Sequence, residues 1–289
     1  MRRFLFMLLM FSLLPSCAGV FFQPQRALVM TPERVGLDYQ DIYIEAADGV
    51  RLHAWYLPAQ GEARGTVLFL HGNAQNISTH IANVYWLPER HYNVLLLDYR
   101  GYGRSAGVPS LDGAVLDAEA AIAWLAARPE VAKQGMAVFG QSLGGALAVY
   151  AAAHSAHRDR IKALIIDSAF SGYRAIVREK LAGFWLTWAV QWPLSLLVDD
   201  RYSPLHAIAD ISPTPVLIIH GEHDPVVPVH HAEHLYAAAG EPKAVWRIPE
   251  SGHIQALTRP EQRRRLAEYL DRIFSACNPN SPQEDCWPI

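Results

Sequence analysis

Continuous apolar runs separated by amphipathic segments recur along the chain and predict alternating strands and helices. The runs 67–70, 94–97 and 164–166 contain only apolar residues, without the polar alternation of a strand that has one face in water. Such runs are typical of parallel strands that helices cover on both faces. The predicted strands are 42–46, 52–57, 66–71, 93–98, 136–139, 163–167, 216–220 and 244–248.

Helical periodicity fills most of the intervals between these strands, at 112–127, 143–154, 229–239 and 260–275. Asp48-Gly49 separates the first two strands and is a hairpin signal, so these two strands should pair antiparallel at one edge. The alternation predicts an α/β protein over residues 39–276. We expect a three-layer α/β/α fold with a mostly parallel central sheet and an N-terminal antiparallel hairpin.

One interval, between the strands that end at Asp167 and begin at Val216, is longer than a crossover needs. We interpret residues 168–213 as a small helical cap inserted into the domain. Trp185, Trp188 and Trp192 recur there at three- and four-residue spacing, which would place all three on one helical face.

The N-terminal segment has the pattern of an export signal. Two arginines precede an apolar run over residues 4–14, which is too short to span a bilayer comfortably. Leu14-Pro15-Ser16-Cys17 resembles the lipobox of bacterial lipoproteins. The resemblance implies a signal peptide at 1–16, lipidation of Cys17 and a membrane-anchored protein on the periplasmic or extracytoplasmic side, at the outer membrane in a Gram-negative cell. The alternative is an ordinary signal peptide with a chance cysteine, and residues 17–38 are predicted to form a tether.

The C-terminal tail 277–289 begins with Cys277 and also contains Cys286. An oxidising compartment allows a disulfide between them, which would close a tail that has no helical period. The alternative is two free thiols. A net charge of −3 offers no basic surface for nucleic acid, and no pattern in the sequence predicts an oligomeric state.

Gly140-Gln141-Ser142-Leu143-Gly144 follows a predicted strand and opens a predicted helix. This is the Gly-x-Ser-x-Gly pattern of a nucleophile elbow, a tight turn that holds the serine hydroxyl free at its tip. The helix begins directly after the serine, so its positive end favours negative charge that develops on a substrate oxygen.

A serine hydroxyl becomes a good nucleophile when a base takes its proton. His253 follows the last predicted strand, and Asp224 lies in His-Gly-Glu-His-Asp-Pro-Val-Val-Pro after the strand 216–220. Together these motifs resemble the α/β-hydrolases of the serine-aminopeptidase-like, monoacylglycerol-lipase-like and depalmitoylase-like group, over residues 40–275. The resemblance implies a triad in which Ser142 is the nucleophile, His253 the general base and Asp224 the acid that orients the base. Asp167, which ends the preceding strand, is the alternative acid.

The same resemblance implies an oxyanion hole formed by the backbone N–H groups of Leu143 and Asn73. His71 would brace the loop that carries Asn73. The tryptophan face of the cap (Trp185, Trp188 and Trp192) is expected to form an apolar acyl pocket over the serine. The alternative is that this face packs on the domain.

The remaining histidines raise the question of a metal. His230 and His234 are four residues apart on a predicted helix, with His223 and His231 nearby. Zinc sites need three or four convergent ligands, and neither a His-Glu-x-x-His pattern nor a cysteine pair accompanies these residues. We therefore interpret them as a solvated helix face and predict neither a metal nor a cofactor.

Three functions remain open on the sequence. The first is hydrolysis of a carboxylic ester or thioester, with an acyl or lipid-like substrate, through an acyl-serine intermediate. The second is a serine aminopeptidase, in which an acidic cap residue binds the free amine of the substrate; the cap offers Glu179, Asp199, Asp200 and Asp210. The third is a non-catalytic, lipid-anchored binding protein, which the presence of all three triad residues disfavours. The expected partners are a small-molecule or acylated substrate and a membrane.

Overall fold

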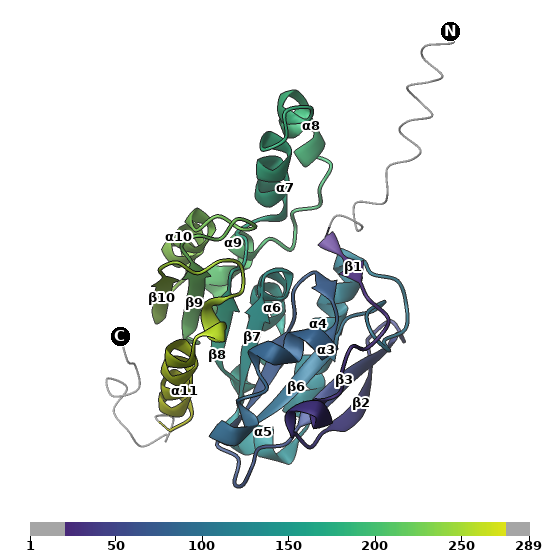
Figure 1. Ribbon diagram of the computed structural model, residues 1–289, viewed down its shortest axis with the longest axis vertical. Coiled ribbons are helices and arrows are strands. Elements are labelled where there is room, and N and C mark those ends of the chain that lie inside the picture. The colour runs from purple at the N-terminus through teal and green to yellow at the C-terminus, as the bar shows by residue number, and fades with distance from the viewer. Residues whose placement is uncertain (1–20, 276–289) are drawn as a thin grey trace.

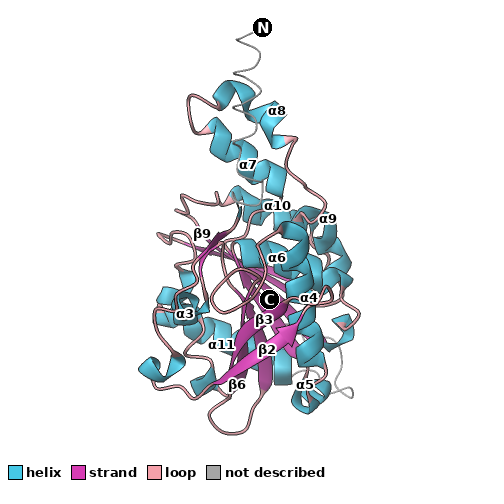
Figure 2. Cartoon of the chain, turned by 90° about the vertical axis from the view of Figure 1, so that its right-hand side faces the viewer, coloured by secondary structure: helices cyan, strands magenta, loops and turns pink. Residues whose placement is uncertain are grey.

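The computed structural model describes residues 21–275, which form one large sheet between two layers of helices (Figures 1 and 2). The strand order is β10-β9-β8-β7-β4-β6-β3-β2, and every pairing is parallel except β2 with β3 and β3 with β6. All eight predicted strands are present, within two residues of the expected ends. They are β2 (Gln40–Glu45), β3 (Arg51–Leu57), β4 (Gly65–Leu70), β6 (Tyr92–Asp98), β7 (Met136–Gln141), β8 (Ile161–Asp167), β9 (Val216–Gly221) and β10 (Lys243–Ile248).

The helices cover both faces of this sheet, as the apolar runs predicted. Successive residues of a strand point to opposite faces, so Leu95 and Leu97 of β6 join one core while Val94 and Leu96 join the other. The first core contains α4 (Leu111–Ala126), α5 (Pro129–Gln134), α6 (Leu143–His154), α9 (Pro204–Ala207) and α10 (His230–Ala238). The second contains α3 (Ile77–His80) and α11 (Pro260–Ser275).

Short 3₁₀ turns complete the connections of the body. They are η1 (Pro32–Val35), η2 (Ile81–Asn83), η3 (Pro88–Arg90), η4 (Arg158–Arg160), η6 (Ile208–Ile211) and η7 (Ala256–Thr258). Within residues 21–275, no helix combines the length and the apolar composition that crossing a membrane would require.

The insertion between β8 and β9 contains helices, as predicted. α7 (Tyr173–Ala182), η5 (Trp188–Val190) and α8 (Gln191–Ser195) project together from one end of the body (Figures 1 and 2). The expectation of one tryptophan-bearing helix is wrong: Trp185 precedes η5, Trp188 begins it and Trp192 lies in α8. The chain turns repeatedly here, so a helical period read across all three residues does not apply.

The predicted tether 17–38 is also wrong for its described part, residues 21–38. Phe21 and Phe22 are buried, and β1 (Gln23–Pro24) pairs in parallel with β5 (Ala74–Gln75). The Asn76 side chain donates hydrogen bonds to the carbonyls of Gln25 and Ala27. The segment therefore packs on the domain because two phenylalanines and its backbone groups find partners there.

The other terminal predictions lie outside the described residues. These are the signal peptide 1–16, the lipidation site Cys17 and the disulfide between Cys277 and Cys286 in the tail 277–289.

Candidate active site

Ser142 occupies a sharp turn between β7 and α6. Its φ of 53° and ψ of −117° are unusual for a residue with a side chain, and such backbone strain persists only where the surroundings enforce it. The neighbouring glycines make the turn possible. A Cβ on Gly140 would lie 2.3 Å from the carbonyl oxygen of Gly144, and one on Gly144 would lie 2.1 Å from that of Leu70. Strand and helix approach so closely here that only glycine fits at either position.

Three side chains from three different loops meet at this turn. Ser142, Asp224 and His253 follow β7, β9 and β10, whose carboxyl ends lie at the same edge of the sheet. The Ser142 hydroxyl lies 3.0 Å from Nε2 of His253, and Nδ1 of His253 lies 2.8 Å from Oδ2 of Asp224. Both distances are ordinary hydrogen bonds, and they connect the hydroxyl through the imidazole to a carboxylate.

The surroundings of Asp224 keep this carboxylate charged. Its Oδ1 accepts hydrogen bonds from the backbone N–H groups of Val226 (2.8 Å) and Val227 (2.9 Å). Burial alone would raise the pKa of Asp224, but the hydrogen bond and charge of His253, together with these N–H groups, bring that pKa below its usual value. An ionised carboxylate can hold the imidazole in one tautomer.

Asp167, the alternative acid, makes no such contact with His253. Its carboxylate accepts hydrogen bonds from Gln141 (2.8 Å) and Ser168 (2.9 Å). Burial raises the pKa of Asp167, and these two hydrogen bonds oppose that rise. The geometry therefore joins Asp224, and not Asp167, to the imidazole.

The loop after β4 lies beside the serine. Asn73 and Leu143 line the same pocket as Ser142. The Asn73 carbonyl accepts hydrogen bonds from the Gln23 N–H (2.9 Å) and the Tyr102 hydroxyl (2.6 Å). His71, at the start of the loop, is fully buried and packs against His80 and Tyr99. It thus supports the loop, as the family resemblance implied.

A pocket of about 250 Å³ opens at Ser142. Its walls come from the loop of Asn73, the start of α6, the segment after Asp224, the first described residue and the inner face of α7. They consist of Phe21, Asn73, Ser142, Leu143, Phe170, Ile176, Val177, Lys180, Leu181, Val226 and Val227. Lys180 is the only charged residue among them, so the pocket is apolar with one cation.

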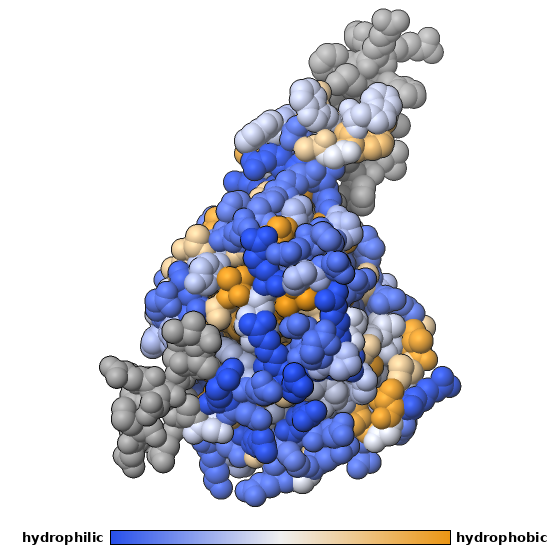
Figure 3. All heavy atoms as spheres, turned by 60° about the vertical axis from the view of Figure 1, so that its left-hand side comes forward, coloured by the Kyte–Doolittle hydropathy of each residue, from blue (hydrophilic) through white to orange (hydrophobic). Residues whose placement is uncertain are grey.

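The predicted tryptophan-lined pocket is wrong. Trp185, Trp188 and Trp192 do not line the pocket, and they are 79%, 64% and 62% exposed. Figure 3 shows pale and tan residues at the projecting end of the cap, whereas blue hydrophilic residues cover much of the body. The pocket-lining part of the cap is α7, which precedes the tryptophans in the chain.

Comparison with known proteins identifies the family of this chain. Residues 61–207 match the family described as serine aminopeptidase, S33. The chain belongs to this family of α/β-hydrolases. It is 37% identical over 246 residues to the uncharacterized protein YfhR of Escherichia coli K12, covering 84% of this chain and 83% of that protein.

Relatives also occur in eukaryotes. Over 219 residues the chain is 37% identical to the α/β hydrolase domain-containing protein WAV2 of Arabidopsis thaliana, covering 73% of this chain and 70% of that one. Among solved structures it is similar to the Pyrococcus furiosus esterase Pf2001, with a TM-score of 0.70 at 24% identity, over 88% of this chain and 98% of that one. The predicted α/β-hydrolase fold is confirmed.

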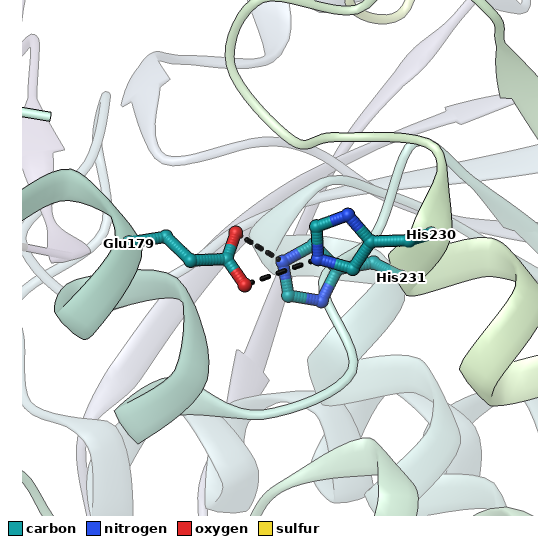
Figure 4. A group of neighbouring side chains, drawn as sticks. All are labelled: Glu179, His230 and His231. Atoms are coloured by element: carbon teal, nitrogen blue, oxygen red, sulfur yellow. Dashed lines mark hydrogen bonds and ion pairs between the residues drawn. The ribbon is translucent and has the colours of Figure 1, made fainter. Parts of the chain in front are cut away.

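A cluster of possible metal ligands joins the cap of this family member to its body. Glu179 of α7 faces the stacked imidazoles of His230 and His231 of α10, with Oε1 3.0 Å from Nε2 of His230 and Oε2 3.1 Å from Nε2 of His231 (Figure 4). The prediction of a solvated helix face is wrong for His231, which is fully buried. No pattern in the sequence indicates that Glu179 of the cap contacts these histidines.

The protonation of His231 decides what this cluster can bind. Its Nδ1 lies 3.1 Å from the backbone N–H of Ser171, so Nδ1 accepts a hydrogen bond there. A neutral imidazole then carries its proton on Nε2, and that N–H donates to Glu179. A metal at Nε2 would need the lone pair that the proton occupies. The cluster is therefore better suited to hydrogen bonds between cap and body than to a cation.

Several pocket residues were not predicted from the sequence, among them Phe21, Ile176 and Val177. Phe21 lies in the segment interpreted as a tether, and Ile176 and Val177 lie on α7, whose helical period was not recognised. The apolar pair Phe21-Phe22, directly after the small residues that follow Cys17, was the available signal that the chain packs there.

Proposed function

We propose that this protein is a serine hydrolase that cleaves an ester or thioester of an apolar acyl group. The pocket is the observation that supports this most directly, because its apolar walls lead to the Ser142 hydroxyl and its single charged residue is the cation Lys180. A volume of about 250 Å³ is just below the usual range for drug-sized ligands. It suits a short or medium acyl chain.

In the proposed mechanism, His253 accepts the proton of Ser142 while Oγ attacks the acyl carbonyl carbon. The negative charge on the carbonyl oxygen is stabilised by the backbone N–H groups of Leu143 and Asn73, and one such donor is typically worth about 10²–10³ in kcat. His253 then gives its proton to the leaving alcohol or thiol. Water, activated by the same imidazole, hydrolyses the acyl-serine, and Asp224 orients the ring throughout.

An aminopeptidase would use the same triad but needs an anionic group for the substrate amine. Glu179 is the acidic residue next to the pocket, and both of its carboxylate oxygens accept hydrogen bonds from histidines. Asp199 pairs with Arg201, and Asp200 accepts from Ser203. Lys180 would repel an ammonium group in the pocket. These contacts favour the ester or thioester over the peptide, and the family's descriptive name does not determine a substrate.

We also propose that the protein is an exported lipoprotein anchored through Cys17. The support is the lipobox-like sequence that ends at this cysteine and the short apolar run before it. Mass spectrometry of the purified protein should find an acylated N-terminal peptide that begins at Cys17. An unmodified cysteine in the mature protein would contradict the proposal.

The function is tested by comparing substrates on purified protein. A fluorophosphonate probe should label the native protein and leave Ser142→Ala unlabelled, which separates an enzyme from a binding protein. Rates on p-nitrophenyl hexanoate and on an octanoyl thioester should then exceed those on aminoacyl p-nitroanilides by at least about 100-fold. Preferential cleavage of the anilides would establish the aminopeptidase instead.

A further inference from the structure

The projecting end of the cap exposes an unusually apolar surface. Residues 184–198 contain no Asp, Glu, Lys, Arg or His, although most of their large side chains face solvent. Soluble monomers rarely expose contiguous apolar patches of this kind unless a partner or a membrane binds there. We define the cap tip as the exposed residues Phe184, Trp185, Leu186, Trp188, Trp192, Leu196 and Leu197.

The N-terminal end of the described chain lies at the base of this same projection. The Phe21 ring packs edge-on against Tyr173, the first residue of α7, with centroids 5.0 Å apart, and also contacts Phe170. Phe21 lines the pocket as well. Phe21, the first described residue, therefore lies beside the pocket and at the base of the cap.

An anchor at Cys17 would consequently lie close to the cap. Cys17 is four residues before Phe21, a span of at most about 14 Å in extended chain. The ten residues of α7 rise about 15 Å along the helix axis. The reach of the anchor and the height of the projection are thus similar. If the apolar run 4–14 is not cleaved, it too is joined to the domain through Phe21.

The chemistry of the cap tip matches the boundary between lipid headgroups and acyl chains. Tryptophan is enriched at both membrane–water interfaces, and leucine beside it supplies apolar area for shallow burial. Behind the tip, α7 carries Arg174, Arg178 and Lys180, cations that anionic headgroups attract. The guanidinium of Arg178 lies over the Trp192 ring, 4.4 Å from its centroid.

We propose that the cap tip docks into the headgroup region of a lipid bilayer and turns the pocket toward the membrane. A short anchor and an apolar projection on one side of the molecule would then hold it in one orientation. A second copy of the chain could cover the cap tip instead, but the position of Phe21 at the base of the cap favours the bilayer, because the proposed anchor Cys17 is only four residues away in sequence. The proposal concerns binding and does not depend on ester cleavage.

The first test measures contact with lipid directly. The full chain is reconstituted in phosphatidylcholine vesicles with ordinary or brominated acyl chains, and tryptophan emission is compared. Trp55, Trp86 and Trp246 are buried in the body, Trp124 is half-buried on α4, and Trp287 lies outside the described residues. The quenching that comes from the cap is therefore the part that a cap variant removes. Replacing all three cap tryptophans (Trp185→Phe, Trp188→Phe, Trp192→Phe) should remove most of the quenching. Equal emission in both kinds of vesicle overturns the proposal, whether the tip lies free in water or against a second copy.

The second test asks whether docking delivers substrate. Trp185→Ser, Trp188→Ser and Trp192→Ser together should lower turnover of a long-chain ester presented in vesicles at least about tenfold. Turnover of dissolved p-nitrophenyl acetate should change less than about twofold, because these residues do not touch the pocket. A control with two exposed body residues replaced, Val108→Ser and Tyr43→Ser, should change neither rate.

Equal losses on both substrates, or no loss on either, would overturn the proposed delivery. The quenching arm needs no turnover, so it tests docking even if the proposed ester hydrolysis fails. Thermal melting of both variants checks that the exposed substitutions leave the fold intact.

Discussion

The acyl pocket can be tested by filling it from the cap. Val177 lines the pocket from α7, and Val177→Trp would place an indole in a space of about 250 Å³. Each methylene that a substrate buries contributes up to about 0.8 kcal/mol, or roughly fourfold in rate if the transition state uses it. Hexanoyl has four methylenes more than acetyl, so the ceiling is about 3 kcal/mol, or roughly 200-fold.

The assay is kcat/KM for p-nitrophenyl acetate, butyrate, hexanoate and octanoate, each below its aggregation concentration. For the unmodified enzyme we expect a rise of roughly tenfold from acetate to hexanoate, since the pocket mouth is open to solvent. Val177→Trp should reduce the rise to less than about threefold and leave acetate turnover within about twofold. That pattern would mean that the longer chain, and not the triad, has lost its site.

The matched control is Trp188→Ala. Trp188 belongs to the cap tip and is 64% exposed, so this change should leave the dissolved-ester series unchanged. If Trp188→Ala flattens the series and Val177→Trp does not, the acyl group binds under the tryptophans and the pocket described here is not the acyl site. If neither variant changes the series, α7 has no part in chain selection.

Three further predictions concern the triad, the elbow and the buried histidines. Asp224→Asn should lower kcat about 10³–10⁴-fold and Asp167→Asn less than about tenfold, measured on one ester; the reverse order would make Asp167 the acid. Gly144→Ala should lower both melting temperature and kcat, because its Cβ would meet the backbone oxygen of Leu70, which no rotamer change relieves; an unchanged melting curve would contradict this. Burial lowers the pKa of His80 and of His231 to about 4, against about 6.5 when unfolded, so the unfolded chain binds these protons first as pH falls. The charge and hydrogen bond of Glu179 only partly offset the burial of His231, and the neighbouring His230 lowers the pKa of His231 further. The free energy of unfolding should therefore decrease between about pH 6.5 and 4, by roughly 2 kcal/mol per histidine near pH 5; denaturant melts of His231→Gln should show a weaker dependence, and those of exposed His206→Gln an unchanged one.

The sequence predicted the central sheet well because its signals are local. Strands such as β6 are apolar at every position, since each face of the sheet meets a helix layer. Gly140 and Gly144 are required by close backbone approach, and that requirement gives a motif that can be read directly. Asp224 and His253 follow strands whose carboxyl ends meet at one edge, so their order along the chain is enough to bring them to Ser142.

The sequence failed where the structure depends on what a segment contacts. The spacing of Trp185, Trp188 and Trp192 permits one helical face, but it does not indicate that the segment breaks into separate short elements and faces solvent. Glu179 could be recognised as an acidic cap residue and not as the partner of His230 and His231, because α7 and α10 meet only in three dimensions. Periodicity identifies an apolar face but does not identify its neighbour.

The N-terminal segment links these features to the proposed function. The backbone N–H of Gln23 donates a hydrogen bond to the Asn73 carbonyl, and the Tyr102 hydroxyl donates one to the same oxygen. Phe21 lines the pocket. The segment that leads to the proposed anchor is thus also part of the wall and the loop around Ser142. A long flexible tether would let the domain tumble freely above a membrane, whereas a chain that packs on the domain from residue 21 onward would hold the pocket near the proposed anchor. An apolar pocket and an exposed aromatic cap tip on the same side are what an enzyme needs if its acyl substrate lies in the bilayer.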